Sequence, residues 1–188
     1  MANTDNNFQV GGGYSVDLAA YHDAVITHQI DGIREKVFGK HELSEEEQKE
    51  LRNFYDSIRK AADEGKEIII NVSNHPSSKW SKEQVDACNG AVILDCAFPN
   101  INEKATAYEM DAACYGFADW LTSTVHGVDK AHVHFMVAGE QGAHFRIVGF
   151  LKMADFSVIQ ATSSRNTVVS EDGKTKTVTF NFGILREY

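Results

Sequence analysis

The feature that most constrains this fold is the run at residues 68–72 (IIINV), in which every residue except one asparagine is apolar. A strand without polar alternation is typical of a parallel sheet that is covered on both faces. The segment after it carries the capping box Ser81-Lys82-Glu83-Gln84, which predicts a helix that ends before Gly90. A second apolar run, residues 91–95, predicts another strand, so the order is that of a βαβ unit.

The alternation of strand and helix continues along the chain. Apolar positions at helical or strand spacing predict two more helices and two more strands. The expected helices span about residues 106–125 and 143–154, and the expected strands span 131–138 and 156–162. Four strands alternating with three helices predict right-handed crossovers and a Rossmann-like α/β fold, in which a mainly parallel sheet is flanked by helices.

The C-terminal part differs in character. Thr- and Val-rich runs at residues 166–170 and 176–183 flank the pair Asp172-Gly173, which is a strong hairpin signal. We therefore expect an antiparallel β-hairpin at the edge of the parallel sheet.

Before the first core strand, apolar residues recur at helical spacing from Ser15 to Val37, and a capping box at Ser44 opens a second helical stretch. Two helices joined by a short polar loop predict a helical hairpin. A short strand is also expected at residues 8–10. We divide the chain into an N-terminal flexible lead and helical hairpin, residues 1–65, and a Rossmann-like domain, residues 66–188.

Composition excludes several classes of function. The 188 residues carry 27 acidic and 18 basic side chains, a formal net charge of −9, which disfavours binding to duplex nucleic acid or to an anionic membrane. No apolar run approaches the roughly 20 residues of a membrane span, and no secretory signal is visible. Cys88, Cys96 and Cys114 lack zinc-cluster or disulfide spacing and are interpreted as buried thiols. These features predict a cytoplasmic protein.

Ligands bind open α/β sheets beyond the carboxyl ends of the strands, so the loop after residues 68–72 is the first candidate site. Hydroxyl, amide and imidazole groups gather there beside backbone N–H donors, a combination that suits phosphate or ribose. A turn in which Ser81 caps the helix and Trp80 packs on the sheet is the alternative. The polar candidates are Asn71, Ser73, Asn74, His75, Ser77 and Ser78.

The second candidate loop is Gly139-Glu140-Gln141-Gly142. Its glycines would let the backbone approach a ligand, and Glu140 could bind a ribose hydroxyl or act as a base. The same residues could form a strand-to-helix turn in which Glu140 caps the helix. The third candidate is Thr162-Ser163-Ser164-Arg165, whose hydroxyls precede a guanidinium able to grip phosphate, with an ordinary surface turn as the alternative.

No cofactor or metal is expected. Neither a Walker A sequence nor a G-x-G-x-x-G motif follows any strand, which argues against an ATPase or a dinucleotide enzyme. His132 and His134 alternate along a strand, but no third metal ligand can be placed beside them. We expect these two histidines to be packed or hydrogen-bonded residues of the sheet.

The stretch from Ile69 to Pro76, followed by Trp80-Ser81-Lys82-Glu83-Gln84, resembles the opening of compact CRISPR-associated Rossmann-fold (CARF) proteins. In small members of that class, including some ring nucleases, a strand ends in a Ser-His-Pro-like turn before a Ser- or Thr-capped helix. The Gly139-Glu140 turn and the strand end at residues 161–165 also suit the two-loop ligand site of that class. The resemblance covers about residues 66–165.

This resemblance implies that a homodimer recognises cyclic oligoadenylate, a small nucleotide second messenger of CRISPR antiviral defence, and that some members also cleave the ring slowly. Metal-independent cleavage would use the substrate 2′-hydroxyl for in-line attack. His75 would assist proton transfer, while Ser73 and Arg165 would stabilise the transition-state charge.

Two other classes of function stay open. One is a small hydrolase or transferase in which His75 and Glu140 act as an acid–base pair on a substrate that is not a nucleotide. The other is a non-enzymatic interaction module, in which the helical hairpin mediates assembly and the polar loop is structural. Our leading hypothesis is nucleotide binding, which requires the three candidate loops to meet at one rim of the sheet.

Overall fold

The computed structural model describes residues 7–10, 14–17, 44–169 and 176–188. Its main sheet contains five strands in the order β4-β3-β5-β6-β7. Neighbouring strands from β4 to β6 are parallel, and β7 is antiparallel to β6. The predicted α/β fold is therefore confirmed. The strands are β3 (Ile68–Ser73), β4 (Val92–Cys96), β5 (Val133–Ala138), β6 (Ser157–Val169) and β7 (Lys176–Glu187).

Four α-helices are described, and their bounds follow from local capping. The helices are α3 (Glu45–Asp63), α4 (Lys82–Ala87), α5 (Ala107–Thr124) and α6 (Gln141–Met153). Each of α3, α4 and α5 begins with a capping box, in which a Ser or Thr and the residue three positions later satisfy each other's backbone N–H groups. Two short 3₁₀ turns, η1 (Ser77–Lys79) and η2 (Lys130–His132), precede α4 and β5.

The two faces of the sheet are covered unequally. Alternate residues of β3, such as Ile68 and Ile70, are fully buried in a large core formed with α3, α5 and α6. On the other face, Ile69 packs in a small cluster with Cys88, at the end of α4, and Met136. The second face therefore has much thinner cover than the first.

The strand order explains this division of the helices. The chain moves from β3 outward to β4 through α4, and then moves back past β3 to β5 and β6 through α5 and α6. Because crossovers share one hand, opposite directions of travel place their helices on opposite faces. The direction reverses between β3 and β5, and such a switch point is where ligands bind open α/β sheets.

The N-terminal prediction is correct in part. Helix α3 confirms the second helix of the expected hairpin, and strand β1 (Asn7–Val10) includes the short strand expected at residues 8–10. The predicted start of the first helix at Ser15 is wrong, because residues 14–17 form strand β2 (Tyr14–Asp17), which pairs antiparallel with β1. Only backbone pairing with β1 distinguishes this short segment from a helix start. The rest of that predicted helix lies outside the described residues.

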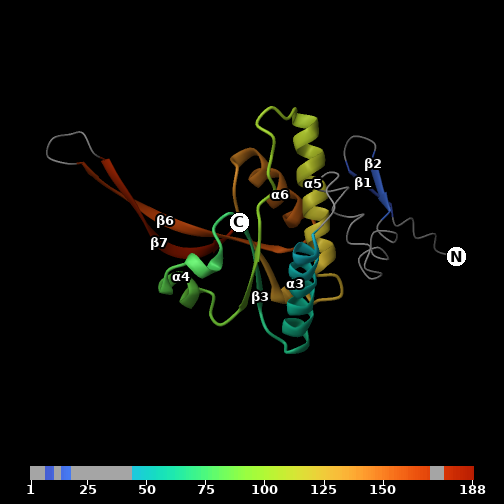
Figure 1. Cartoon of the computed structure of the whole chain (residues 1–188), viewed down its shortest axis with the longest axis horizontal. Helices are drawn as coiled ribbons and strands as arrows, with labels where there is room; N and C mark the ends of the chain where they lie inside the picture. Colours follow the sequence, from blue (N-terminus) through green and yellow to red (C-terminus); the bar gives the residue numbers. More distant parts are fainter. Residues whose placement is uncertain (1–6, 11–13, 18–43, 170–175) are drawn as a thin grey trace.

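The C-terminal hairpin is longer than expected. The predicted fourth strand and the first hairpin strand are one continuous element, β6, which pairs with β5 near its start and with β7 along its length. The register shifts between Ala161 and Ser163. The hairpin extends well beyond the helical layers (Figure 1). The side chains of residues 163–167 are exposed.

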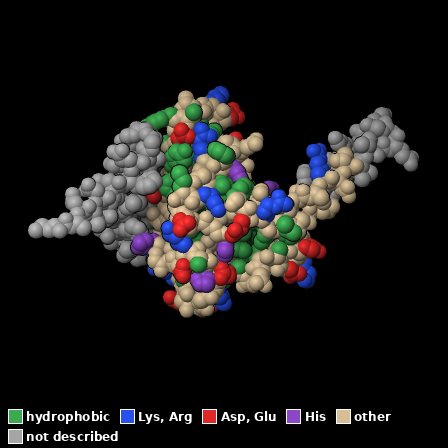
Figure 2. Space-filling view, turned by 180° about the vertical axis from the view of Figure 1, so that it is seen from behind, with side chains coloured by type: hydrophobic (Ala, Val, Ile, Leu, Met, Phe, Trp, Pro, Cys, Tyr) green, Lys and Arg blue, Asp and Glu red, His purple; other side chains and the backbone are tan. Residues whose placement is uncertain are grey.

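The distribution of charged side chains and the state of the three cysteines can be compared with what the composition predicts. Acidic and basic side chains are interspersed over the face of the body seen in Figure 2. No described helix is both long and apolar enough to cross a membrane. Cys88 and Cys114 are buried, Cys96 is partly buried, and all three are free thiols. Burial raises the pKa of the Cys114 thiol to about 11 and that of Cys96 to about 12.

Candidate functional site

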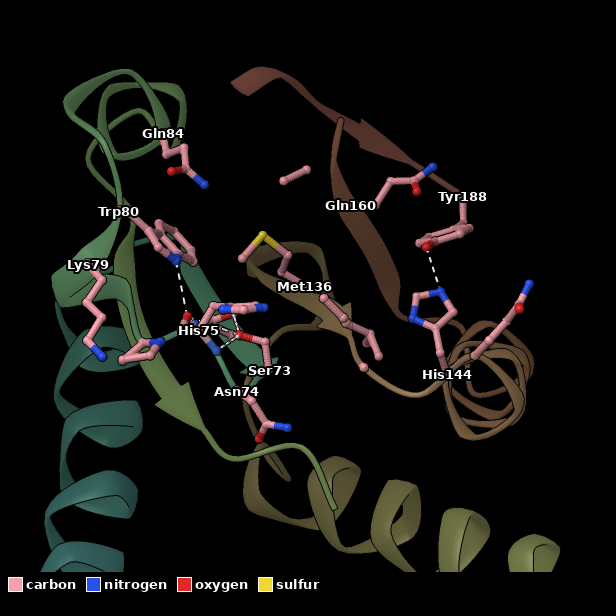
Figure 3. Close-up of a pocket in the computed structure, with 17 residues that line it drawn as sticks. Ser73, Asn74, His75, Lys79, Trp80, Gln84, Met136, His144, Gln160 and Tyr188 are labelled. Atoms are coloured by element: carbon pink, nitrogen blue, oxygen red, sulfur yellow. Dashed lines mark hydrogen bonds between the residues drawn. The ribbon is translucent and has the colours of Figure 1, made fainter. Parts of the chain in front are cut away.

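An open cavity of about 690 Å³ lies at the carboxyl ends of β3 and β5, at the switch point of the sheet (Figure 3). This volume is typical of small-molecule sites. One wall is the loop after β3 together with Gln84 of α4, and residues 136–139 of β5 and its end form the floor. The opposite wall comes from α6, β6 and the end of β7, and its residues are Gln141, His144, Gln160, Ala161 and Tyr188.

Asp95, at the end of β4, holds the loop after β3 in place. Its carboxylate accepts a hydrogen bond from Asn71 Nδ2 at 2.7 Å. It also accepts from the backbone N–H of Ser77 at 2.9 Å and from the Ser77 hydroxyl at 2.8 Å. Ser77 therefore faces Asp95 rather than the cavity. Sequence reasoning missed Asp95, although a carboxylate at the end of a neighbouring parallel strand is a signal that could have identified it.

The backbone of His75 is the second anchor of the loop. Its carbonyl oxygen accepts hydrogen bonds from Asn71 Nδ2 at 3.0 Å, from Ser73 Oγ at 3.1 Å and from Trp80 Nε1 at 3.2 Å. The His75 N–H donates to Ser73 Oγ at 3.1 Å. The main chain is thus fixed, while the His75 imidazole lines the cavity without a hydrogen bond to any other residue in the described ranges.

Asn71 and Ser73 line the cavity but belong to the framework of the loop. Asn71 is 1% exposed and Ser73 is 8% exposed. Besides its bond to the His75 carbonyl, the Ser73 hydroxyl lies 2.9 Å from Asn71 Oδ1, so its single proton is engaged within the loop. Asn74 differs, because it is exposed at the rim of the cavity and has no internal hydrogen-bond partner of its side chain among the described residues.

The second predicted loop also reaches the cavity, but Glu140 does not line it. Its carboxylate is the N-cap of α6 and accepts from the backbone N–H groups of Gly142 at 2.9 Å and Ala143 at 2.7 Å. These hydrogen bonds hold the pKa of Glu140 below its ordinary value. Glu140 therefore caps the helix after the turn, which is the alternative role considered for it from the sequence.

Gly139 is on the floor of the cavity, and its lack of a side chain serves packing. A Cβ at this position would lie 2.4 Å from ring atoms of Phe98, which is buried in the main core. The glycine thus gives room to Phe98 as well as shaping the floor.

The third predicted loop lies outside the cavity. Residues 162–165 run along the hairpin, where Thr162 Oγ1 bonds to the backbone of Ile184 and Arg165 pairs in register with Phe180. The structure brings the first two loops together and does not bring the third to them, so the expected meeting of all three loops at one rim is wrong and the site consists of two loops and the wall from α6, β6 and the end of β7. Predicted site residues that line the cavity are Asn71, Ser73, Asn74, His75, Gly139 and Gln141, whereas Ser77, Ser78, Glu140, Gly142, Thr162, Ser163, Ser164 and Arg165 do not.

The opposite wall contains a pair that sequence reasoning missed. The Tyr188 hydroxyl lies 2.7 Å from His144 Nε2. Burial lowers the pKa of His144 and raises the pKa of Tyr188, so both groups are uncharged near neutral pH and share a hydrogen bond between neutral partners. Tyr188 is held there because its N–H donates to the Val158 carbonyl at 3.0 Å. No local motif links these residues, since only the pairing of β6 with β7 brings them together.

The charge of the cavity differs from that of the whole protein. None of the described residues that line it is Asp or Glu, although the chain carries a formal net charge of −9. Lys79 and the imidazoles of His75 and His144 are its basic groups. Trp80 provides an aromatic wall. Four amide side chains can donate and accept hydrogen bonds: Asn74, Gln84, Gln141 and Gln160.

The two histidines lie at the amino end of the parallel strands, opposite the cavity, and both are hydrogen-bonded as predicted. His134 is in β5, whereas His132 belongs to the 3₁₀ turn η2 before it, so the predicted alternation along one strand is wrong for His132. Glu67 accepts from His132 Nδ1 at 2.6 Å and lies 3.0 Å from His134 Nε2. His134 Nδ1 in turn lies 2.9 Å from Ser157 Oγ. These contacts raise the pKa of His132 and lower that of Glu67. Within the described parts of the chain, no group of His, Cys, Asp and Glu side chains could hold a metal ion.

Comparison with known proteins gives a family but no annotated relative. No curated protein and no solved structure shows significant similarity to the chain. One family profile matches residues 37–186, a range that spans α3, the five-stranded sheet and nearly all residues lining the cavity. Because this match covers well over half of the sequence, the chain belongs to the Uncharacterized protein MJ1673 family.

Proposed function

We propose that the cavity binds a small nucleotide. The observation that carries this proposal is its lining: an acidic protein has a cavity in which no described lining residue is a carboxylate and Lys79 is accompanied by two imidazoles. A lysine can neutralise phosphate, and Trp80 offers a surface on which a base can stack. The position at the switch point of the sheet supports the same conclusion.

The resemblance to CARF proteins supports cyclic oligoadenylate as the ligand. In this proposal two copies of the chain form a homodimer in the cytoplasm and share one ring, so that each cavity takes part of it. The three free thiols fit a reducing compartment. The role in the cell would be detection of a second messenger in antiviral defence.

Cleavage of the ring is an extension of this proposal. The substrate 2′-hydroxyl would attack the adjacent phosphorus and form a 2′,3′-cyclic phosphate, while the 5′-oxygen leaves with a proton. The imidazoles of His75 and His144 are the groups in the cavity that can move these protons. The Ser73 hydroxyl is hydrogen-bonded within the loop and Arg165 lies outside the cavity. Neither residue is therefore proposed to stabilise the transition-state charge, the role expected from the sequence.

The structure argues against the alternative acid–base pair. Glu140 is bound to two backbone N–H groups of α6 and does not line the cavity beside His75. A hydrolase or transferase would need another partner for His75.

A thermal-shift panel tests nucleotide binding. We expect cyclic tetra-adenylate or cyclic hexa-adenylate to raise the melting temperature, because a ligand at about 100 times its Kd stabilises a protein by roughly 2.7 kcal/mol. Lys79→Gln should weaken this effect. Lys82→Gln removes the same charge from an exposed residue outside the cavity and is the matched control.

Lack of stabilisation by any nucleotide would contradict the proposal and leave the non-enzymatic interaction module. Incubation of the labelled rings with the protein then separates a sensor from a nuclease. A cleaving protein should yield linear products that end in 2′,3′-cyclic phosphate, and His75→Ala and His144→Ala identify which imidazole the reaction needs.

A further inference from the structure

The capping boxes differ at one position. In α3 and α5 the residue that completes the box is a glutamate, Glu47 or Glu109, whereas in α4 it is Gln84. Of these three residues, only Gln84 also lines the cavity. A glutamate can complete such a box equally well, so the cap does not require an amide at this position.

The capping contact fixes the orientation of the Gln84 amide. The backbone N–H of Ser81 donates to Gln84 Oε1 at 3.0 Å, so the carbonyl side of the amide is turned toward the cap. The NH₂ group, with two donors, is on the other side. No described residue accepts a hydrogen bond from it, and Figure 3 shows the Gln84 side chain beside Trp80, at the cavity.

Trp80 is fixed next to this donor. Its indole N–H donates to the His75 carbonyl at 3.2 Å, and its ring packs against the small cluster that includes Met136 and Cys88. The ring is therefore held before any ligand arrives. A rigid aromatic wall lowers the entropy that a flat ligand must lose on binding.

Three backbone N–H groups at the ends of β3 and β5 that could hold phosphate are already used. The N–H of Ser77 donates to Asp95, and those of Gly142 and Ala143 donate to Glu140. At the ends of both β3 and β5, a carboxylate of the chain thus occupies the position that a phosphate would take. The side chains that line the cavity therefore carry a large share of recognition in this proposal.

We infer that Trp80 and Gln84 form a nucleobase subsite, in which the base stacks on the indole and an acceptor nitrogen of its ring receives a hydrogen bond from Gln84 Nε2. This inference rests on the proposed function and names the part of the ligand that the site reads. An adenine base has such acceptors, including N7. The phosphate lies toward Lys79 and contributes less to selectivity.

The test exchanges the amide for a carboxylate without removing the cap. Gln84→Glu keeps the capping box in the form found in α3 and α5, but it replaces the two donors with negative charge. Gln48→Glu makes the same exchange on α3, outside the cavity, and controls for net charge. Calorimetric titrations use cyclic tetra-adenylate, cyclic hexa-adenylate, adenosine 5′-monophosphate and, as a probe without a base, ribose 5-phosphate.

We expect Gln84→Glu to weaken the tightest adenine nucleotide by about tenfold or more, with an unchanged melting temperature in the absence of ligand. Gln48→Glu should bind like the unmodified protein, and ribose 5-phosphate should bind far more weakly than adenosine 5′-monophosphate. Equal affinity of Gln84→Glu and the unmodified protein, or equal affinity of the two monophosphates, would overturn the subsite while nucleotide binding stands. Failure of the unmodified protein to bind any of the adenine nucleotides would overturn both proposals.

Discussion

Asp95 shows how one residue outside the predicted loop determines the shape of the site. Its carboxylate accepts hydrogen bonds from the Asn71 amide and from both the N–H and the hydroxyl of Ser77. Removing it takes away the partner of one Asn71 amide proton and of both Ser77 donors beside the end of β3, while Asn71 keeps its bond to the His75 carbonyl. Unsatisfied groups of this kind each cost about 1–3 kcal/mol when they are buried.

We predict that Asp95→Ala lowers the free energy of unfolding by about 2–3 kcal/mol, measured by urea denaturation. Asp86→Ala, which removes an exposed carboxylate paired with Lys82, should change it by less than about 0.5 kcal/mol. Equal effects of the two substitutions would show that Asp95 does not anchor the loop.

Asp119 is a buried carboxyl group of α5, 8% exposed, whose side chain accepts no hydrogen bond from the other described residues. Burial raises its pKa from 3.8 to about 6. Between these two values the folded state keeps a proton that the unfolded state releases, so this group makes stability fall as pH rises toward 6. About one pH unit above the pKa of the folded state the loss is nearly complete, and it stays constant at higher pH.

Asp119→Asn removes this penalty. We predict a gain of about 1–2 kcal/mol in the free energy of unfolding at pH 7.5, after a discount for partial solvent screening. The gain should disappear near pH 4, where the carboxyl group is neutral in the folded protein. Urea denaturation at the two pH values measures it, and a difference independent of pH would contradict the prediction.

At the scale of elements, the sequence was most informative where local signals coincide. The capping box at Ser81 and the apolar run before it located α4 and β3 correctly, because both depend on neighbouring residues. Strand β6 was predicted as two pieces, since the polar stretch Ser163-Ser164-Arg165 has no apolar period. Its pairing with β7 is made by the backbone, which does not require apolar side chains.

The register shift in the β6–β7 hairpin lies opposite Gly183, which packs closely against Thr162. A Cβ on Gly183 would lie 2.7 Å from Thr162 Oγ1, and that oxygen is held by the backbone N–H of Ile184 at 2.9 Å. We predict that Gly183→Ala destabilises the protein by about 1–3 kcal/mol. Gly149→Ala in α6, where a Cβ meets nothing within 4 Å, should stabilise it by about 0.5–1 kcal/mol. Urea denaturation of the two variants should therefore show opposite signs; the same sign for both would contradict this account.

At the scale of the whole molecule, the cavity requires residues that no local pattern connects. The loop after β3 was predictable because ligands bind beyond the ends of parallel strands. His144 and Tyr188 were not, because they become neighbours only when β7 returns alongside β6. The same pairing carries Arg165 away from the sheet rim, so a hydroxyl- and arginine-rich sequence that suits phosphate in isolation is part of the hairpin instead.

The two tryptophans provide the most direct test of the central claim, that the cavity beside Trp80 binds a nucleotide. Trp80 lines the cavity, whereas Trp120 is buried where its indole N–H donates to the Tyr55 hydroxyl on α3. The measurement is an NMR titration of the two ¹⁵N-labelled indole N–H signals with cyclic tetra-adenylate. The account predicts that the Trp80 signal shifts until it saturates while the Trp120 signal stays in place; an unchanged Trp80 signal at saturating ligand would contradict it.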